Sequence, residues 1–329
     1  MTQKILVVGG AGYIGSHMVL RLAQAGHDVV VYDNLGSGHR DAVLAGQLVV
    51  GDLADRAALW QLFSAHRFDA VMHFASSIQV GESMVKPARY YANNVGNTIH
   101  LIEAMLAHDV QRLIFSSTAA IFGNPAYTPI DEQHPRQPVN PYGTSKWMVE
   151  QILADCDRAN GLQYVALRYF NAAGAHPDGL LGERHEPETH LIPLVIQAAL
   201  GQRPEVGVFG TDYDTPDGTC IRDYIHVQDL ADAHLLALDH LMAGKGSAAF
   251  NLGNGCGFSV HEVIQTVEQA TGLQVPVKHL PRRPGDPAVL VADSTLARQT
   301  LGWTPQYGDL QDIIRHAWQW HRKTAPQPQ

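Results

Sequence analysis

Two side chains that follow Pro141 have the chemistry and the spacing needed for proton transfer. Tyr142 and Lys146 are four residues apart in a segment rich in good helix formers. On a helix this spacing places both side chains on one face, one turn apart. A free phenol has a pKa near ~10, and a neighbouring ammonium favours the phenolate, so the pair could supply a general base. A surface tyrosine and lysine also fall at this spacing by chance, so the rest of the chain must decide between the two interpretations.

A glycine-rich turn separates an expected strand at 4–8 from an expected helix at 16–25. Its glycines, Gly9, Gly12 and Gly15, would allow a tight turn, the approach of backbone amides to a pyrophosphate, and close packing of helix on strand. The next expected strand, 29–32, ends at Asp33. A carboxylate there would bond an adenosine ribose and repel a 2′-phosphate, which predicts NAD rather than NADP. The alternative is a tight turn that binds nothing.

Strands and helices continue to alternate through the first half of the chain. Expected strands are 48–50, 70–74, 112–116 and 165–169, and the helices between them are 57–65, 90–108 and 146–159. This order predicts an α/β fold with a doubly wound parallel sheet (Rossmann), whose ligands lie beyond the carboxyl ends of the strands. Asp52, Ser77, Thr118 and Asn171 all fall at those ends and should face one crevice. Any one of them alone is more typical of a helix cap or a turn.

The composition changes after Asn171. Residues 175–188 are rich in Gly, Pro and His and predict a loop, and 276–287 is proline-rich. Further expected elements are helices at 193–200, 227–241 and 259–271, the last capped by Ser259, and strands at 224–227, 250–252 and 289–292. We predict a dinucleotide-binding domain at 1–172, with a return segment near 222–245 packed on it, and a smaller substrate domain at 173–329. Residues 324–329 should be disordered.

Composition limits the partners of the chain. Its 329 residues suffice for two domains, and a net charge of −9 argues against nucleic acid. No apolar run reaches the ~18 residues of a membrane span, and a strand follows Met1 directly, so we expect neither a membrane anchor nor a signal peptide. Cys156, Cys220 and Cys256 are scattered and odd in number, which favours reduced thiols and a cytoplasmic location. The 18 histidines show no His-Glu-x-x-His or comparable spacing, so no metal site is predicted.

Eight motifs together carry a family resemblance. They are Gly-Gly-Ala-Gly-Tyr-Ile-Gly-Ser-His, His-Phe-Ala with Val-Gly-Glu-Ser, Phe-Ser-Ser-Thr-Ala-Ala, Tyr-Gly-Thr-Ser-Lys, Arg-Tyr-Phe-Asn-Ala-Ala-Gly-Ala, Thr-His-Leu-Ile-Pro, Asp-Gly-Thr-Cys-Ile-Arg-Asp-Tyr-Ile-His-Val and Arg-Arg-Pro-Gly-Asp. From Lys4 to about Arg322 the chain resembles the extended short-chain dehydrogenase/reductase family, and within it the UDP-glucose 4-epimerases. The first and fourth motifs are shared by the whole superfamily. The others, in this order, are specific to the epimerases.

The resemblance implies a role for each matching residue. Tyr142 would take the proton of the sugar 4-hydroxyl while hydride leaves carbon 4 for the nicotinamide. Lys146 would hold the cofactor ribose and lower the phenol pKa, and Thr118 would bond the 4-oxygen and relay the proton. The implied cofactor-binding residues are Gly9, Gly12, Tyr13, Ile14, Gly15, Asp33, Asn34, Asp52, Leu53, Phe74, Ala75, Ser77, Asn94, Lys146 and Phe170. The implied substrate-binding residues are Thr118, Tyr142, Asn171, Leu191, Phe209, Arg222, Arg283, Asp286 and Leu290.

These roles imply interconversion of UDP-glucose and UDP-galactose with bound NAD. The 4-keto sugar would rotate after transient oxidation at carbon 4, and hydride would return to its opposite face. Two arginines on separate loops suit a diphosphate, although Arg282 and Arg283 taken alone would be a solvated basic pair. The resemblance also implies a homodimer formed through the helices at 90–108 and 146–159.

Three departures from the epimerase pattern stand out. Ile78 occupies a position where some relatives carry Lys, Phe122 replaces a common Tyr, and His190 replaces an Asn beside Leu191. None removes a group that the chemistry requires. Leu290 matches a position where a bulky Tyr accompanies rejection of N-acetylated sugars, so the smaller Leu predicts that UDP-N-acetylhexosamines are accepted. The alternative is that Leu290 is an ordinary core residue of a strand, and an alignment error of one residue would shift the role to Val289 or Val291.

Other functions on the same scaffold remain open at this point. A different nucleotide-sugar epimerase would share these motifs. A nucleotide-sugar 4,6-dehydratase would need an acid and a base after Thr118, where Ala119 and Ala120 offer neither. A non-catalytic NAD-binding protein is a third possibility, and the intact Thr118, Tyr142 and Lys146 argue against it.

Overall fold

A seven-stranded parallel sheet organises the molecule. The computed structural model describes residues 2–283 and 285–324. In spatial order the strands are β10 (Ala248–Leu252), β6 (Gln163–Tyr169), β5 (Arg112–Thr118), β4 (Ala70–His73), β1 (Lys4–Val8), β2 (Asp28–Asp33) and β3 (Gln47–Val50). Every neighbouring pair is parallel. This confirms the predicted α/β fold with its doubly wound parallel sheet.

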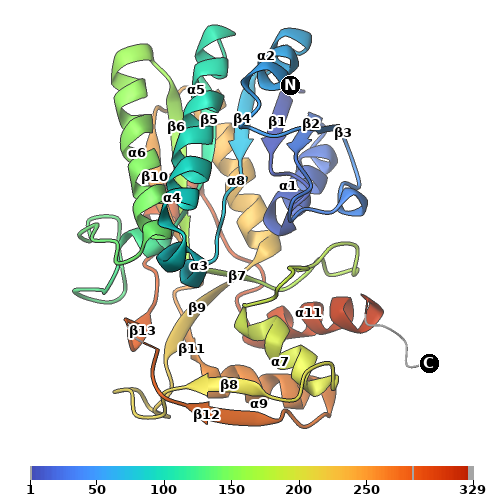
Figure 1. Cartoon of the computed structure of the whole chain (residues 1–329), viewed down its shortest axis with the longest axis vertical. Helices are drawn as coiled ribbons and strands as arrows, with labels where there is room; N and C mark the ends of the chain where they lie inside the picture. The colour runs from blue at the N-terminus through green and yellow to red at the C-terminus, as the bar shows by residue number, and fades with distance from the viewer. Residues whose placement is uncertain (1, 284, 325–329) are drawn as a thin grey trace.

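Helices bury both faces of this sheet (Figure 1). One face is covered by α2 (Arg56–Ala65), α5 (Asn97–Ala107) and α6 (Pro141–Asn160), and the other by α1 (Tyr13–Gln24), α8 (Val227–Met242) and α10 (Thr295–Leu301). Leu101 and Val149 are fully buried on the first face, and Met18 and Leu238 on the second. Because both faces are covered, the sequences of the strands are nearly continuous apolar runs. This is why the strands could be located in the sequence.

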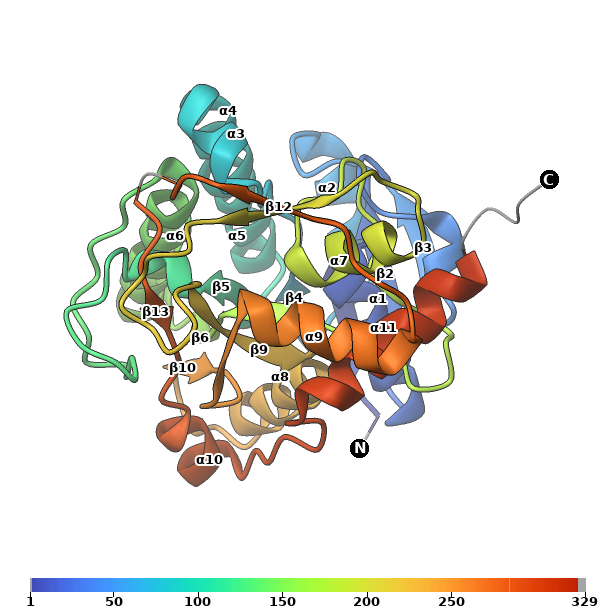
Figure 2. The ribbon, with the colours of Figure 1, turned by 90° about the horizontal axis from the view of Figure 1, so that it is seen from below.

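A second layer lies beyond the end of the sheet to which its strands point (Figures 1 and 2). A small sheet orders β11 (Gly257–Ser259), β9 (Ile221–His226) and β13 (Val289–Leu290), with β7 (Asn171–Ala173) also on β9. Strands β8 (Val206–Phe209) and β12 (Val277–Leu280) form a pair. Helices α7 (Leu191–Ala199), α9 (Val260–Thr271) and α11 (Leu310–Thr324) share a separate core with β8 and β9. As predicted, Ser259 caps α9, in a capping box with Glu262.

The two layers are interleaved along the chain. Strand β10 joins the large sheet although it follows the substrate-side elements, and α8 packs on α1 and β6. The proposed division of the chain at 172 stays a prediction. No helix within residues 2–283 and 285–324 is long and apolar enough to cross a membrane.

Several elements differ from the sequence prediction. The helix expected at 90–108 is divided into α4 (Pro87–Tyr90), the π-helical turn η2 (Tyr91–Gly96) and α5, and the strand expected at 289–292 has only two residues. Strands β8 and β12 and helices α10 and α11 were not predicted. Short elements complete the list: η1 (Arg40–Ala42), α3 (Val80–Val85) and η3 (Ala119–Ile121). Residue 324 ends α11, and the rest of the tail predicted to be disordered lies outside the described residues.

Two glycines fix the turn between β1 and α1. Gly9 has a φ of 80°, and a Cβ on it would lie 2.5 Å from the backbone nitrogen of Ala75. A Cβ on Gly15 would lie 2.2 Å from the carbonyl oxygen of Gly9. In both cases the atom that the new Cβ would overlap belongs to the backbone, which cannot move aside as a flexible side chain would. The helix therefore packs on the turn at a distance that only glycine allows.

Replacement of Gly15 by alanine should destabilise the fold. Because the methyl group would overlap backbone, we expect the free energy of unfolding to fall by roughly 1–3 kcal/mol or more, measured by denaturant titration. Gly81→Ala is the matched control, since Gly81 lies in exposed α3 with no atom within 4 Å of the new methyl. That variant should be neutral or slightly stabilised. Equal stabilities for the two variants would contradict the role assigned to Gly15.

Candidate active site

The first turn of α6 rests on the turn that follows β5. The side chain of Asn140 accepts a hydrogen bond from the backbone N–H of Gly143 at 2.8 Å and caps the helix. A Cβ on Gly143 would lie 2.4 Å from the carbonyl oxygen of Ala120. Thr118 ends β5, and its hydroxyl accepts from the N–H of Ala120 at 3.1 Å. This close approach brings Tyr142 beside Thr118, as the sequence predicts.

The surroundings of Tyr142 favour the neutral phenol. Burial raises the pKa of Tyr142, and the hydroxyl of Thr118 opposes this by hydrogen bonding. The expected lowering of this pKa by Lys146 stays a prediction. In this structure the ammonium of Lys146 bonds to Ser76 and Ser116, and Thr118 is the group hydrogen-bonded to the phenol.

Lys146 is buried between β4 and β5, with 2% of its surface exposed. Its Nζ donates to the hydroxyl of Ser76 at 2.6 Å and to the carbonyl oxygen of Ser116 at 2.8 Å. Burial lowers the pKa of Lys146 to about 7, while the negative charge of Glu150 opposes the shift. An ammonium has three N–H donors, so one remains available for a ligand.

Glu150 belongs to a buried ion pair one turn farther along α6. It is 4% exposed and Arg168 of β6 is 3% exposed. The guanidinium donates twice to Oε2 of Glu150, at 2.6 and 3.1 Å, and the hydroxyl of Ser117 donates to Oε1 at 2.5 Å. Both charges are therefore compensated inside the core, and they hold α6 against the ends of β5 and β6.

The N-terminus of α1 fits a pyrophosphate. No side chain caps it and its first turn carries no acidic residue, so its backbone N–H groups are free for an anion. The nearest atom to a Cβ on Gly12 would be 3.5 Å away, so a side chain there would extend into the space before the helix. Asp33 accepts from the N–H groups of Ala11 at 2.9 Å and Leu35 at 2.8 Å. These bonds brace the loop and leave each carboxylate oxygen a lone pair for a ribose.

Four other predicted cofactor residues form bonded pairs along the same sheet edge. Asn34 donates to Asp52 at 2.8 Å. Asn94, on the π-helical turn η2, accepts from the N–H of Ser77 at 2.8 Å and donates to the hydroxyl of Ser145 at 3.0 Å. The amide of Asn94 thus ties the loop after β4 to α6, one residue before Lys146. Its direct contact with a cofactor stays a prediction.

Several predicted cofactor residues turn their side chains away from this edge. The hydroxyl of Tyr13 donates to the carbonyl oxygen of Gly174 at 2.7 Å, and Phe74 packs against His234. Ile14 packs against the core, and Phe170 packs against the cluster formed by Ile121, Phe122 and Ile130. The backbone N–H of Ala75 donates to the carbonyl oxygen of Val8, and the side chain of Leu53 is buried. Contact of this group with a cofactor stays a prediction.

The residues predicted to hold a diphosphate lie together. Asp286 pairs with Arg222 at 3.0 Å and with Arg283 at 3.3 Å. Arg283 also lies over the ring of Phe209, 4.5 Å from its centroid. Both guanidiniums are therefore held by one carboxylate at the edge of the small sheet. Asn171 donates to the carbonyl oxygen of Asp223 at 2.9 Å, and Leu191 begins α7.

Leu290 lies between this group and the catalytic turn. It pairs with Arg222 in the β13–β9 ladder and packs, partly buried, against Ile121 and Phe122. Phe122 follows η3, which begins directly after Thr118. Leu290 thus links the strand that carries Arg222 to the turn after Thr118, and its contact with a substrate stays a prediction.

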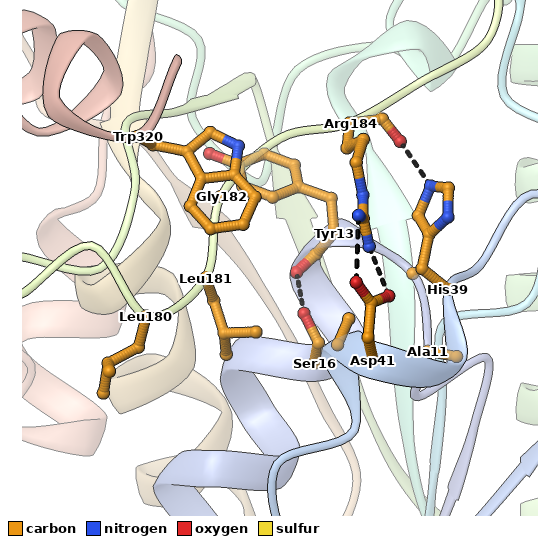
Figure 3. Close-up of a pocket in the computed structure, with 12 residues that line it drawn as sticks. Ala11, Tyr13, Ser16, His39, Asp41, Leu180, Leu181, Gly182, Arg184 and Trp320 are labelled. Atoms are coloured by element: carbon orange, nitrogen blue, oxygen red, sulfur yellow. Dashed lines mark hydrogen bonds and ion pairs between the residues drawn. The ribbon is translucent and has the colours of Figure 1, made fainter. Parts of the chain in front are cut away.

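A pocket of about 100 Å³ lies on the outer side of the glycine loop (Figure 3). Arg184 lies beside the start of α1, and its guanidinium donates to the carboxylate of Asp41 at 2.6 and 3.1 Å. The backbone carbonyl oxygen of Arg184 is hydrogen-bonded to Nε2 of His39 at 3.1 Å. Trp320 of α11 closes another side against Gly182 (Figure 3). The 175–188 loop therefore covers the glycine loop, which the sequence did not predict.

The fold also gathers possible metal ligands that the sequence analysis did not predict. Glu183, His185, Glu188 and His190 each place one ligand atom within 4.8 Å of the others. They lie in the irregular segment before α7, where neither a helical nor a strand period links residues with the spacing Glu-x-His-x-x-Glu-x-His. These ligands can be found in the sequence only by a search for the spacing Glu-x-His-x-x-Glu-x-His itself.

Comparison with known proteins agrees with this geometry. The model of the NAD dependent epimerase/dehydratase family matches residues 5–253. The UDP-glucose 4-epimerase of Halalkalibacterium halodurans is 53% identical, over 98% of this chain and 96% of that protein. The chain belongs to this family, among its UDP-glucose 4-epimerases. The crystal structure of the Brucella ovis epimerase in complex with NAD superposes with a TM-score of 0.95 at 51% identity, covering 97% of this chain and 98% of that one. The UDP-Glc/GlcNAc 4-epimerase of Campylobacter jejuni gives 0.86 at 45% identity, covering 98% and 99%.

The epimerase site also depends on residues that the sequence analysis did not single out. Gly143 sets the approach of α6 to the Thr118 turn, Ser76 and Ser116 hold Lys146, and Glu150 with Arg168 supplies the buried ion pair. Ser116, Gly143 and Arg168 stand inside recognised motifs, so their positions were visible although their contacts were not. The pairing of Arg168 with Glu150 gave no signal, because the two residues lie on different elements.

Proposed function

We propose that the chain interconverts UDP-glucose and UDP-galactose, with NAD as its bound cofactor. The observation that carries the proposal is the placement of Tyr142 beside Thr118, with the ammonium of Lys146 buried one turn farther along α6. NAD, when bound, would accept a hydride from carbon 4 of the sugar and return it to the opposite face. The remaining chemistry belongs to side chains of the chain itself.

Thr118 and Tyr142 would move one proton. The phenolate of Tyr142 would accept the proton of the 4-hydroxyl and hold it while carbon 4 is a ketone, and the hydroxyl of Thr118 would bond the same oxygen. Because burial disfavours the phenolate, positive charge must be brought near it. The free N–H of Lys146 would bind the cofactor ribose. The ammonium would then lie close enough to the Tyr142 phenolate to stabilise its negative charge.

Arg222 and Arg283 would hold the diphosphate while the sugar turns. Their shared carboxylate, Asp286, keeps both guanidiniums in place, and planar forks suit phosphate oxygens. Binding through the diphosphate leaves the hexose free to rotate, which an epimerisation at carbon 4 requires. The turn after Thr118 carries Ala119 and Ala120, so it offers no acid and base for the elimination of water that a 4,6-dehydratase performs.

We further propose that the protein is a cytoplasmic homodimer. Ile99 on α5 and Met148 on α6 are each 38% exposed, on the two helices through which the family resemblance implies pairing. The three free cysteines, of which Cys256 is exposed, suit a reducing compartment. Light scattering on the purified protein would contradict the dimer if it gave the mass of one chain.

Tyr142→Phe should keep the fold and lose nearly all turnover. Removal of a general base commonly costs ~10² to 10⁴ in rate, and the ring that packs against the protein is retained. Turnover of UDP-galactose is the measurement, and Tyr127→Phe is the control, since Tyr127 is 44% exposed and bonded to Asp131. A Tyr142 variant with more than about a tenth of wild-type turnover would refute the assignment.

The nucleotide released from the denatured protein should be NAD and not NADP. Asp33 is 7% exposed at the end of β2 and braces the glycine loop through Ala11 and Leu35, so it cannot turn away from a 2′-phosphate without disturbing the loop. Mass spectrometry of the released nucleotide is the measurement. Recovery of NADP as the main species would overturn the cofactor assignment.

The substrate pocket should also accept N-acetylated sugars. Leu290 lacks the outer ring and hydroxyl of a tyrosine, so at this position between Arg222 and the Phe122 cluster it would exclude an acetamido group less than a tyrosine would. The measurement is the ratio of turnover on UDP-N-acetylgalactosamine to turnover on UDP-galactose. Leu290→Tyr should lower this ratio on the order of tenfold or more, because a filled pocket rejects the larger substrate.

Val289→Tyr is the matched control for the size of the new side chain, on the neighbouring position of the same strand. If it lowers the ratio while Leu290→Tyr does not, the gate is Val289. If the wild type turns over only the non-acetylated pair, no gate of this kind operates in the pocket.

A further inference from the structure

We propose that Glu183, His185, Glu188 and His190 form a binding site for a divalent transition-metal ion, with zinc as the ion that the ligands suit best. Two imidazole nitrogens and two carboxylate oxygens are typical zinc ligands, and four protein ligands are typical of a structural site. The set lies between the loop that covers α1 and the start of α7, apart from Tyr142 and Lys146. It therefore concerns the architecture of the protein rather than its chemical step.

The distances within the cluster match one common centre. A tetrahedral zinc ion with ligands at about 2.0–2.1 Å separates those ligand atoms from one another by roughly 3.3–3.4 Å. Nδ1 of His190 lies 2.8 Å from Oε1 of Glu183. Nδ1 of His185 lies 3.2 Å from Oε1 of Glu183 and 3.6 Å from Oε2 of Glu188. These three separations lie within roughly 0.6 Å of the tetrahedral value, and all four ligand atoms lie within 4.8 Å of one another.

Hydrogen bonds within the cluster leave one imidazole nitrogen without a partner among the described residues. Nδ1 of His185 is buried and has no hydrogen-bond partner among the described residues, although a carboxylate oxygen of Glu183 is 3.2 Å away. Nδ1 of His190 is hydrogen-bonded to Oε1 of Glu188 at 2.9 Å, and Oε1 of Glu183 lies 2.8 Å from the same nitrogen, although one N–H can point at only one of the two oxygens. Ligands of a metal are close neighbours whose lone pairs point at the ion and not at one another.

Charge leads to the same conclusion. The side chains of Glu183 and Glu188 are only 4% and 5% exposed, so two negative charges are removed from water within a few ångströms of each other. Buried charge of this kind must be compensated. One divalent cation supplies the required two positive charges with both imidazoles neutral. The competing arrangement is a metal-free cluster in which both imidazoles are protonated.

The ligands are held by surrounding groups, as metal ligands generally are. Oε1 of Glu188 accepts the backbone N–H groups of Thr189 at 2.7 Å and of His190 at 2.9 Å, which leaves Oε2 for an ion. The carbonyl oxygen of Glu183 accepts from the indole of Trp320 at 3.1 Å. The ring of His185 packs edge-on against Tyr13. The side chains would thus keep their positions when an ion enters.

The decisive experiment measures metal content and metal geometry on the untagged full-length protein. After incubation with one equivalent of zinc and dialysis, wild type should retain close to one zinc per chain by elemental analysis. His185→Asn/His190→Asn should retain about tenfold less or lower still, because it removes both nitrogen ligands. His261→Asn is the control, a histidine beside Glu262 on α9 outside the cluster, and it should retain as much as the wild type.

Cobalt gives a second readout that does not depend on the variants. Co²⁺ added to the wild type should produce the intense visible absorption of a tetrahedral ion, and one equivalent of zinc should abolish it. Glu183→Gln, which keeps the shape of the side chain, should weaken cobalt binding even if the double variant fails to fold.

Two results would overturn the proposal. One is a wild type that retains no more zinc than the folded double variant, which would mean protonated imidazoles or adventitious surface binding. The other is a cobalt spectrum typical of an octahedral aqueous ion. Neither readout involves turnover of a nucleotide sugar, so failure of this proposal and failure of the proposed epimerase function can be told apart.

Discussion

The burial of one lysine ammonium is the constraint on which the active site depends. Lys146, which we propose binds the cofactor ribose, lies at the ends of β4 and β5 and is only 2% exposed. An unpaired buried ammonium would be neutralised or would destabilise the fold. The chain retains it with two hydrogen bonds, to Ser76 and Ser116, and with the negative charge of Glu150 one turn farther along the helix. Even so the pKa of Lys146 falls to about 7, so its protonation is poised near neutrality.

That arrangement requires α6 to sit closer to the sheet than ordinary side chains permit. Gly143 makes the approach possible, because a methyl group there would overlap the carbonyl of Ala120. The ion pair between Glu150 and Arg168 then holds the third turn of the helix against β6. Replacement of Arg168 alone would leave a buried, uncompensated carboxylate, and such changes cost about 3–5 kcal/mol. Catalytic geometry and core stability therefore rest on the same few contacts, and a change that loosens one would loosen the other.

The sequence was informative where local pattern decides the structure. Strands buried on both faces read as apolar runs, and the glycine turn and the Tyr142–Lys146 pair are short motifs whose geometry is local. The direction of a side chain is decided by tertiary contacts. The sequence therefore placed Tyr13 and Phe74 beside the cofactor loop, but it did not show that Tyr13 bonds to Gly174 and that Phe74 packs against His234. Helix α11 had a readable signal in Leu310, Ile313, Ile314 and Ala317, spaced for one helical face. The ligand cluster at 183–190 lies on no regular element, so no period could predict it.

This cluster joins the two ligand-binding regions of the molecule. Its His185 packs on Tyr13, which begins the helix behind the glycine loop, and His190 directly precedes the helix that begins at Leu191. Whatever neutralises Glu183 and Glu188 therefore also sets the distance between these two helix starts. Two protons and one divalent ion compensate the same charge, but they do not impose the same geometry. Protons form separate pairwise bonds that can lengthen independently, whereas an ion holds all four ligands to one centre. A bound ion would consequently keep the loop, the cofactor helix and the substrate helix in one fixed arrangement while the sugar rotates between them.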